Sequence, residues 1–440
     1  MNAGKPVEYE DVLLAIDALS QGPRRPHLQR MARLLELLGH PQREMPLFHV
    51  AGTNGKGSTA TFLAFALTEN GYRTFLFTSP HLVAVEERFQ RDGVPMERDT
   101  FLTLFSEILR LGEKVADEEG EMPTVFELFT ALFYRWAREE RADVLVLETG
   151  LGGRLDPTTA ETLPLVSLLT SVSLDHTDRL GPTREAIAWE KAHIAKEGRP
   201  LVAAVDQEVE PVVREVASRR GASFHPLTEE ARFETFLRPK SPLPVTHLRY
   251  EGPSWSFRDL PLSLPGFHQG RNAALALLAL EKAQDRLPLD PDASARGITR
   301  AWLPCRLESM ALPEGRVLLL DGAHNEESAS SLAAFLRLLP FRRRHVLLGA
   351  VAGKDLSRLV PLLTEGAAGA VLTRAPHPKG LSPEALAPYV PPGIPIHLEA
   401  EPGPALQKGL SLLGPGELLL IAGSFYLCGA LRPLLRAKCR

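Results

Sequence analysis

The chain has 440 residues, of which 44% are hydrophobic and 24% charged, a globular composition long enough for about two or three domains. Its net charge of −4 gives no reason to expect a whole-protein affinity for nucleic acid, and its apolar runs fall short of the roughly 20 residues that cross a bilayer. The three cysteines lack zinc spacing and the N-terminus lacks an apolar signal core, so we expect a cytoplasmic protein without a membrane partner.

The first predicted strand, 46–50, runs into a glycine-rich segment, Gly52-Thr53-Asn54-Gly55-Lys56-Gly57-Ser58-Thr59, and a helical pattern follows over 61–70. Such a turn points backbone N–H groups inward, and the helix start adds partial positive charge, which suits a polyphosphate. Lys56 would reach the outer phosphates, and a hydroxyl just beyond it would face a magnesium ion. The segment therefore predicts a site for ATP, or a close relative, with Mg²⁺.

The segment departs from the general phosphate-loop pattern at two positions. Val50 stands where the first glycine belongs, and Gly57 rather than Ser58 directly follows the lysine. A plain strand-to-helix connection is therefore the alternative interpretation. The strand before the turn and the helix after it favour the nucleotide site.

Strands and helices alternate along the rest of the N-terminal region. Short strands are predicted at 73–78, 143–148 and 165–170, and helices at about 97–118, 124–140 and 183–197. This alternation predicts a parallel, doubly wound sheet whose ligands bind at the carboxyl ends of the strands. Polar clusters follow several of these strands, at 52–58, 78–81, 148–150 and 173–177.

The second half of the chain begins with an irregular, proline-rich stretch from about 222 to 265, in which we expect short extended pieces. A helix at 272–286 and a proline-containing linker near 287–304 follow, and strands are then predicted at 316–320, 345–349, 368–373 and 417–421. We predict an α/β fold with a P-loop-type, doubly wound, mostly parallel sheet domain over 1–298 and a smaller Rossmann-like α/β domain over 299–440.

Glu148 ends the apolar run 144–147. A carboxylate at the end of a buried strand is costly unless it meets a cation, so metal binding is favoured. Ser79, in a Ser-Pro-His turn, would alone be interpreted as a turn serine, and His176 as a structural histidine. Beside Glu148, both become candidate ligands of a magnesium ion.

Further candidates lie along the chain. Lys191 falls on the predicted helix 183–197, where a solvated surface lysine is the default interpretation. Asn272 opens the next helix and could bond to an adenine edge or merely cap the helix. Arg306 suits a γ-phosphate or a developing acyl phosphate, and Asp321 suits a ribose hydroxyl or an ammonium group.

Together these motifs resemble folylpolyglutamate synthase/dihydrofolate synthase, the folate branch of the Mur ligase superfamily, over nearly the whole chain. The matching positions are 52–58, Ser79-Pro80-His81-Leu82, Glu86, Arg88, 148–156, Asp175-His176-Thr177, Leu180-Gly181, Glu190-Lys191-Ala192, Asn272, Arg306, 321–325 and Gly423-Ser424-Phe425. The Ser-Pro-His-Leu turn and the segment 151–156 look specific to the folate branch.

The resemblance implies ATP-dependent amide formation. A folate or dihydropteroate carboxylate would attack the γ-phosphate of ATP to give an acyl phosphate, and the amine of L-glutamate would then displace phosphate. The resemblance implies catalytic roles for Lys56, Lys191, Arg306 and His324, the last beside the incoming glutamate. ATP would be held by Thr53, Asn54, Gly55, Lys56, Gly57, Ser58, Asn272, Arg306 and Asp321.

The resemblance also implies a metal site and a pterin pocket. Ser79, Glu148 and His176 would bind Mg²⁺, and Lys191 would carry a carbamate that supports a second ion. The pterin would lie around Gly22, Pro23, Arg24, Phe126, Glu127, Gly152, Gly153 and Arg154. The family also implies a monomer, and bacterial relatives are often bifunctional.

Two positions depart from the family pattern. Cys305 stands where a glycine commonly precedes the arginine, and Glu326 where proline is frequent. Two alternative functions remain open, a Mur-type ligase acting on a UDP-linked muropeptide and a non-catalytic, ATP-binding regulatory protein. The pteroate-side motifs argue against the first, and the second leaves Arg306, Asp321 and the metal cluster without a purpose.

Overall fold

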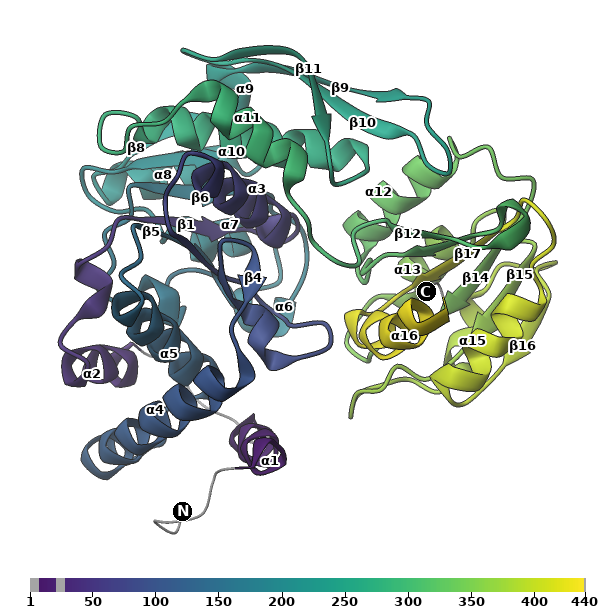
Figure 1. Cartoon of the computed structure of the whole chain (residues 1–440), viewed down its shortest axis with the longest axis horizontal. Helices are drawn as coiled ribbons and strands as arrows, with labels where there is room; N and C mark the ends of the chain where they lie inside the picture. The colour runs from purple at the N-terminus through teal and green to yellow at the C-terminus, as the bar shows by residue number, and fades with distance from the viewer. Residues whose placement is uncertain (1–7, 21–27, 439–440) are drawn as a thin grey trace.

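The protein is described here by a computed structural model that covers residues 8–20 and 28–438. Within these residues the strands form three sheets, and the first and last belong to two units that stand side by side in Figure 1. The predicted α/β fold class is confirmed. No helix of the described residues is long and apolar enough to cross a membrane.

The first sheet has eight strands in the order β4-β3-β2-β5-β1-β6-β7-β8, and the six from β2 to β8 in this order run parallel. Its strands are β1 Leu47–Ala51, β2 Thr74–Phe77, β3 Phe89–Arg91, β4 Val94–Pro95, β5 Val144–Glu148, β6 Val166–Leu169, β7 Pro200–Ala203 and β8 Ser223–Pro226.

Helices cover both faces of this sheet, which is why its central strands are apolar on both sides. Phe48 of β1 packs in the cluster that contains α3 and α10, whereas Leu47 packs with α4 and α5. The helices of this unit are α1 Tyr9–Ser20, α2 Gln29–Leu37, α3 Lys56–Glu69, α4 Arg98–Glu119, α5 Val125–Glu139, α6 Thr177–Leu180, α7 Arg184–Ala192, α8 Glu210–Arg219, α9 Leu227–Glu230, α10 Phe267–Ala283 and α11 Pro291–Arg300.

The stretch expected to be irregular, 222–265, contains a separate three-stranded antiparallel sheet in the order β11-β10-β9. Its strands are β9 Arg232–Arg238, β10 Val245–Glu251 and β11 Ser256–Leu262. The prolines that suggested irregular structure fall mainly in the connections, at 239, 242, 244 and 253, where no ladder hydrogen bond is lost. Leu248 and Tyr250 of β10 are fully buried and join the core under α10.

The expected linker, 287–304, contains the helix α11, a feature that the sequence analysis missed. The side chain of Asp290 caps its N-terminus by accepting from Ala293 N, and Pro291 occupies the first turn, a common helix-start pattern. At Gly297 a Cβ atom would lie 2.4 Å from Ala66 Cα, so α11 packs directly on the backbone of α3. The expected domain boundary after 298 falls within this helix.

The C-terminal unit is built on a six-stranded sheet in the order β12-β13-β17-β14-β15-β16, parallel except for β12. The strands are β12 Glu308–Ala311, β13 Val317–Leu320, β14 Arg344–Leu348, β15 Gly369–Leu372, β16 Ile396–Leu398 and β17 Leu418–Ala422, and the helices are α12 Glu326–Leu336, α13 Leu356–Thr364, α14 Pro383–Leu386, α15 Pro402–Ser411 and α16 Phe425–Lys438.

Candidate active site

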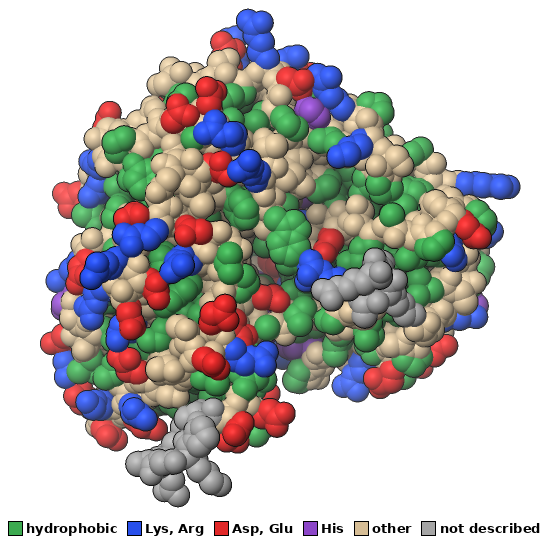
Figure 2. Space-filling view, in the orientation of Figure 1, with side chains coloured by type: hydrophobic (Ala, Val, Ile, Leu, Met, Phe, Trp, Pro, Cys, Tyr) green, Lys and Arg blue, Asp and Glu red, His purple; other side chains and the backbone are tan. Residues whose placement is uncertain are grey.

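A cavity of about 410 Å³ lies between the first and the C-terminal units, and Figure 2 shows the hollow where the two lobes meet. Its walls come from the loops that follow β1, β2, β5 and β6 and from the loops that follow β13 and β14. The cavity gathers the predicted residues Thr53, Asn54, Gly55, Lys56, Gly57, Ser58, Ser79, Glu148, His176, Lys191, Asn272, Arg306, Asp321 and His324.

The glycine-rich segment forms a tight loop at the N-terminus of α3. Gly55 precedes the helix with φ of 84°, and a Cβ atom there would lie 2.5 Å from Asn272 Oδ1. Only glycine fits at this position without displacing the asparagine. Lys56 Nζ folds back over the loop and donates to the carbonyls of Gly52 and Thr53, each at 3.2 Å. The loop thus has the open, cationic shape that suits a polyphosphate.

Asn272 does not cap its helix, because α10 begins at Phe267 with Gly266 as the preceding residue. Its amide nitrogen donates to Gln269 Oε1 at 3.0 Å, and its oxygen faces Gly55. The capping interpretation of Asn272 is therefore wrong. The side chain lies where it could contact a ligand of the phosphate loop.

Glu148 ends β5 and is only 4% exposed. One carboxylate oxygen accepts from Ser79 N at 3.0 Å, and Lys56 Nζ lies 4.0 Å from the other. Burial raises the pKa of Glu148 above its ordinary value, opposed by the positive charges of Lys56, Arg306 and Arg88. A buried carboxylate with so few hydrogen bonds fits a divalent cation, which would supply the missing ligands.

The two other predicted protein ligands lie beside the same cavity. His176 has a left-handed backbone with φ of 50° at the start of α6, and burial lowers its pKa. Ser79 follows β2 and is bound to Glu148 through its backbone N–H. Across residues 8–20 and 28–438 no group of three or more His, Cys, Asp and Glu side chains is arranged to hold a metal. The set of Ser79, Glu148 and His176 therefore stays a prediction.

Lys191 is not the solvated surface group that a helix lysine usually is. It is 4% exposed, and its Nζ donates to the Gly52 carbonyl at 2.6 Å. Burial, with the nearby charge of Lys56, lowers the pKa of Lys191 to about 7. A large share of this amine is therefore neutral near pH 7, which is the form that reacts with carbon dioxide.

The C-terminal unit contributes Arg306, Asp321 and His324. Asp321 directly follows β13 and accepts from the backbone N–H groups of Leu307 and Ala323, both at 2.9 Å. Burial raises its pKa, and Arg306 opposes that shift. The Arg306 guanidinium stacks on Phe425 at 4.7 Å from the ring centre. His324 Nδ1 donates to the Gly322 carbonyl at 3.0 Å.

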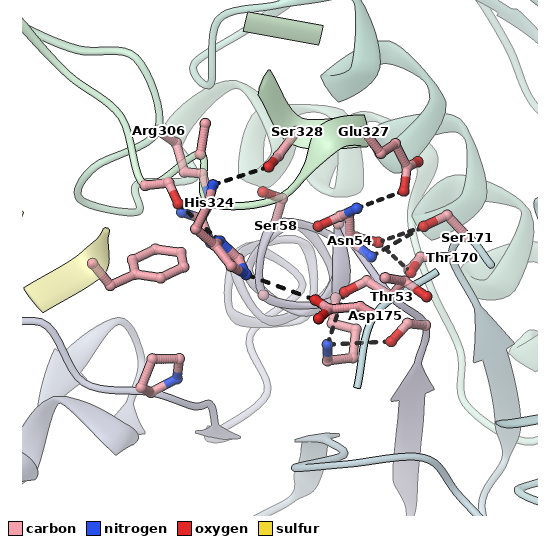
Figure 3. Close-up of a pocket in the computed structure, with 18 of the residues that line it drawn as sticks. Thr53, Asn54, Ser58, Thr170, Ser171, Asp175, Arg306, His324, Glu327 and Ser328 are labelled. Atoms are coloured by element: carbon pink, nitrogen blue, oxygen red, sulfur yellow. Dashed lines mark hydrogen bonds and ion pairs between the residues drawn. The ribbon is translucent and has the colours of Figure 1, made fainter. Parts of the chain in front are cut away.

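The structure also places side chains in the cavity to which the sequence analysis assigned no role. Lys354 follows β14 and binds Asp175 across the cavity, with Nζ 2.6 Å from Oδ1. Glu327, in the first turn of α12, reaches Asn54 and Ser173 of the first unit, as Figure 3 shows for Asn54. Lys354 could have been found, because it is a charged residue in a glycine-containing loop after a strand. Glu327 gives no such signal, since acids are common in a first turn.

The predicted pterin residues are not among those that line the cavity. Gly22, Pro23 and Arg24 lie outside the described residues. Glu127 is committed to the start of α5, where its carboxylate accepts from Thr124 N at 2.6 Å and from Arg30 Nε at 3.2 Å.

The remaining pterin candidates border the cavity from outside. Arg154 binds Glu190, with Nη2 2.9 Å from Oε1, and stacks on Trp189. Phe126 packs against Gly150, where a Cβ atom would lie 2.6 Å from its ring, and Gly150 lines the cavity. Gly152 and Gly153 continue from Gly150 but do not line the cavity. A pterin pocket at these positions stays a prediction.

Cys305, which replaces the family glycine, has φ of 54°. This left-handed conformation is one that glycine adopts without strain, which explains the family preference. Here the cysteine is fully buried, and the Gly322 N–H bonds to its carbonyl at 3.0 Å. The substitution therefore leaves the approach of Arg306 to the cavity intact.

Comparison with known proteins agrees with this fold. A family model of the Mur ligase middle domain matches residues 50–280, and a model of the Mur ligase glutamate ligase domain matches residues 305–425. The fold and cavity thus define a Mur-type ligase.

Individual relatives narrow the assignment. Dihydrofolate synthase/folylpolyglutamate synthase of Bacillus subtilis is 37% identical over 334 residues, which are 75% of this chain and 76% of that protein. Folylpolyglutamate synthase of Lacticaseibacillus casei is 31% identical over 439 residues, 98% of this chain and 99% of that one. The chain belongs to the folylpolyglutamate synthase/dihydrofolate synthase family of ATP-dependent ligases.

Solved structures support the same family. Folylpolyglutamate synthase of Mycobacterium tuberculosis, complexed with ADP and AMPPCP, superposes with a TM-score of 0.87 at 30% identity, covering 96% of this chain and 98% of that one. The bifunctional synthase of Yersinia pestis, complexed with AMPPNP and a manganese ion, superposes with a TM-score of 0.82 at 26% identity, covering 97% and 98%. Membership in this family decides against a muropeptide ligase and against a non-catalytic regulatory protein.

Proposed function

We propose that this chain joins L-glutamate to the carboxylate of a folate or dihydropteroate, with ATP as the source of energy and Mg²⁺ as the metal ion. The observation that carries the proposal is the composition of one cavity. It combines a phosphate loop, the buried Glu148 and the low-pKa Lys191 of the first unit with Arg306 and His324 of the C-terminal unit. Amide formation through an acyl phosphate needs both a phosphate site and a water-poor reaction space.

In this mechanism the backbone N–H groups of residues 55–58 and the side chain of Lys56 bind and orient the β- and γ-phosphates of ATP, because the N–H groups of Thr53 and Asn54 already donate to Ser171. Arg306, held on Phe425, faces the space between the two units and would neutralise charge that develops on the transferred phosphoryl group. His324 lies on the C-terminal side, where it would orient the amine of glutamate. Closure of the two units around the substrates would exclude water from the acyl phosphate.

The divalent ion would supply Lewis-acid polarisation of the phosphoryl oxygens. Ser79, Glu148 and His176 are the residues proposed to hold it, and the partial satisfaction of the Glu148 carboxylate supports this choice. Lys191 would hold a carbamate for a second ion, supported by its burial and by its pKa of about 7. Asn272 and Asp321 are proposed to complete the ATP site.

The contacts with the pterin, the location in the cell and the oligomeric state are proposed from the likeness to the folylpolyglutamate synthase/dihydrofolate synthase family. The pterin would bind beside Phe126 and Glu127 and the loop of Gly152, Gly153 and Arg154, with Gly22, Pro23 and Arg24 nearby. We propose both dihydrofolate synthase and folylpolyglutamate synthase activity, in a cytoplasmic monomer. We also propose that the chain through the end of α11 at Arg300 forms the ATP-binding domain, two residues beyond the expected boundary, and that the rest forms the glutamate-ligase domain.

The test is ADP release by the purified protein with ATP, Mg²⁺ and L-glutamate, with dihydropteroate and tetrahydrofolate added in separate reactions. Release that requires either pterin supports the proposal and identifies which activities the chain has. A Lys56→Met variant should lose this release, whereas Lys114→Met, at an exposed position of α4, should retain it. Release that is indifferent to both pterins would contradict the proposal.

A further inference from the structure

A set of polar contacts connects the tip of the phosphate loop with the start of α12 across the cavity. Two residues of the first unit, Asn54 and Ser173, meet two of the C-terminal unit, Asn325 and Glu327, and we call these four the interdomain clasp. Figure 3 shows Asn54 and Glu327 pointing toward one another from opposite walls. None of these contacts is needed to build either sheet.

Glu327 is the centre of the clasp. Its Oε2 atom accepts from Asn54 Nδ2 and also from Ser173 Oγ at 2.6 Å. Asn325 Nδ2 donates to Asn54 Oδ1 at 3.0 Å, so the Asn54 amide is bound at both its nitrogen and its oxygen. Both atoms of the Asn54 side-chain amide are thereby held by the C-terminal unit.

The backbone of Asn54, in contrast, is held by its own unit. Its N–H donates to Ser171 Oγ at 3.0 Å, and its carbonyl accepts from Thr170 Oγ1 at 2.6 Å. Asn54 therefore joins the two units, with its backbone bound to the loop after β6 and its side chain bound to Asn325 and Glu327. A change in the distance between the units would break the side-chain contacts before it moved the loop.

The type of residue at 327 is informative. The side chain is half-buried, and among the described residues no lysine or arginine forms a salt bridge with it. It accepts hydrogen bonds from neutral groups of the first unit, the Asn54 amide and the Ser173 hydroxyl. An acid in the first turn of α12 is favoured by the helix dipole, and Asn325 caps the same helix by accepting from Ser328 N at 3.0 Å. The C-terminal half of the clasp is thus a rigid helix start with a fixed acceptor.

We propose that Glu327 is a positioning residue that, through Asn54 and Ser173, sets the distance between the phosphate loop and the C-terminal side chains Arg306 and His324. Its effect on turnover rests on the proposed function, but its effect on the separation of the two units does not. Because Glu327 acts through Asn54 and has no assigned contact with ATP, its loss should lower kcat more than it raises the KM for ATP.

The experiment compares three variants of the full chain. Glu327→Ala removes the acceptor, Glu327→Gln keeps a carbonyl oxygen at the same place, and Glu326→Ala removes an equal charge from the exposed neighbouring residue of the same helix turn. The measurements are the radius of gyration by X-ray scattering and the kinetics of pterin-dependent ADP release.

We expect Glu327→Ala to increase the radius of gyration and to lower kcat about fivefold to tenfold, the loss that corresponds to the net contribution of about one ordinary hydrogen bond. The KM for ATP should change by less than about twofold, since the loop amides that would bind the phosphates are untouched. Glu327→Gln should restore most of kcat, and Glu326→Ala should match the wild type.

A second variant avoids any change in α12. Ser173→Ala removes one of the two donors to Glu327 and should cause a smaller change in the same direction. The double variant Ser173→Ala/Glu327→Ala should be no worse than Glu327→Ala alone, because both changes remove the same contact.

The proposal is overturned if Glu327→Ala matches Glu326→Ala in both scattering and kcat, or if it lowers only the unfolding temperature. It is also overturned if the KM for ATP rises with kcat unchanged. If the wild type shows no pterin-dependent release, the proposed function fails, while the scattering comparison still decides whether the clasp holds the units together.

Discussion

The carboxyl edges of the two parallel sheets each present one buried acid to the cavity, Glu148 at the end of β5 and Asp321 just after β13. Burial raises the pKa of both, and the charge of Arg306 opposes that rise in both. Their hydrogen bonds differ. Asp321 accepts from two backbone N–H groups at 2.9 Å, whereas Glu148 accepts from one, that of Ser79, at 3.0 Å.

The difference indicates that an acid at the end of a buried strand can serve either to hold the backbone together or to bind a cation. The two backbone partners of Asp321 belong to Leu307, at the end of the interdomain connection, and to Ala323, in the loop after β13. Asp321 therefore fastens the connection to the sheet, in addition to any contact with ATP. The Glu148 carboxylate accepts only one backbone hydrogen bond, so more of its negative charge is left without a partner, which favours a bound cation. An acid that ends a buried strand is thus a ligand candidate only when the backbone leaves it unsatisfied.

The largest expected effect on turnover follows from Glu148→Gln, which keeps the shape and removes the charge. We expect pterin-dependent turnover to fall about a hundredfold or more, because several kcal/mol of metal-derived stabilisation would be lost. The unfolding temperature at pH 7 should stay the same or rise. Burial raises the folded-state pKa of Glu148, so its ionisation at neutral pH costs folding free energy, and glutamine has no such cost.

The outcome that would contradict this prediction is a lower unfolding temperature with turnover retained. Glu148 would then resemble Asp321, with a structural role and no metal to hold. Calorimetric titration of each protein with Mg²⁺ in the presence of a non-hydrolysable ATP analogue gives an independent readout, since the variant should bind the ion more weakly.

Lys191→Met should lower turnover about a hundredfold, since methionine fills the buried site but cannot form a carbamate. The control is Lys196→Met, because Lys196 is also largely buried, has a pKa lowered to about 8 and does not line the cavity. Removal of dissolved carbon dioxide should reversibly reduce the turnover of the wild type and leave that of Lys191→Met unchanged. Equal turnover with and without carbon dioxide in the wild type would exclude a carbamate.

The positive charge of Arg306 opposes the raised pKa of both Glu148 and Asp321, so its removal should raise the pKa of both carboxylates further. We expect Arg306→Met to lower turnover about tenfold or more through weaker stabilisation of the phosphoryl group. Arg306→Lys should restore only part of it, because lysine lacks the planar fork that stacks on Phe425. Single-turnover measurement of acyl transfer separates this effect from product release, and full activity in Arg306→Lys would contradict a role for the fork.

Asp321→Asn should have the smallest effect on turnover and a clear effect on stability. The amide nitrogen of asparagine cannot accept from a backbone N–H, so one of the two contacts is lost and a donor faces a donor. We expect a loss of about 1–3 kcal/mol in the free energy of unfolding, measured with urea. Unchanged stability would contradict the structural role of Asp321, and any rise in the KM for ATP would measure its proposed contact with ATP.

The comparison also shows which parts of the site the sequence could predict. The phosphate loop was predicted from its glycine pattern between a strand and a helix, and Glu148 from the cost of a buried acid at the end of a strand. Ser79 became a candidate because parallel strands bring their carboxyl ends together. Lys191 was assigned through the resemblance, since nothing local distinguishes a buried helix lysine from a solvated one. Glu327 was missed because its contacts join two units distant in sequence, whereas Lys354 follows a predicted strand and its local signal was overlooked.

The fold, like the site, was predicted in part. Most apolar strands buried on both faces were located within a residue or two, because an apolar run with polar ends is a strong local signal, but the short buried strand β7 was missed. The extended pieces within 222–265 were expected, but their pairing into a three-stranded sheet was missed, as was α11, because proline was taken as evidence against regular structure. In both cases proline occupies a permitted position, in a turn or in the first turn of a helix.

The close packing of α11 on α3 at Gly297 bears on how such ligases can be recombined. Because α11 lies against the helix that begins at the phosphate loop, it would have to travel with the first unit when glutamate-ligase halves are exchanged between relatives. The crossover point that preserves both halves lies after Arg300 and before Glu308, where the chain leaves one folded body and enters the next. A chimaera joined there would keep the phosphate loop with the helices α3 and α11 that pack beside it, and would exchange only the unit that we propose binds the amino acid.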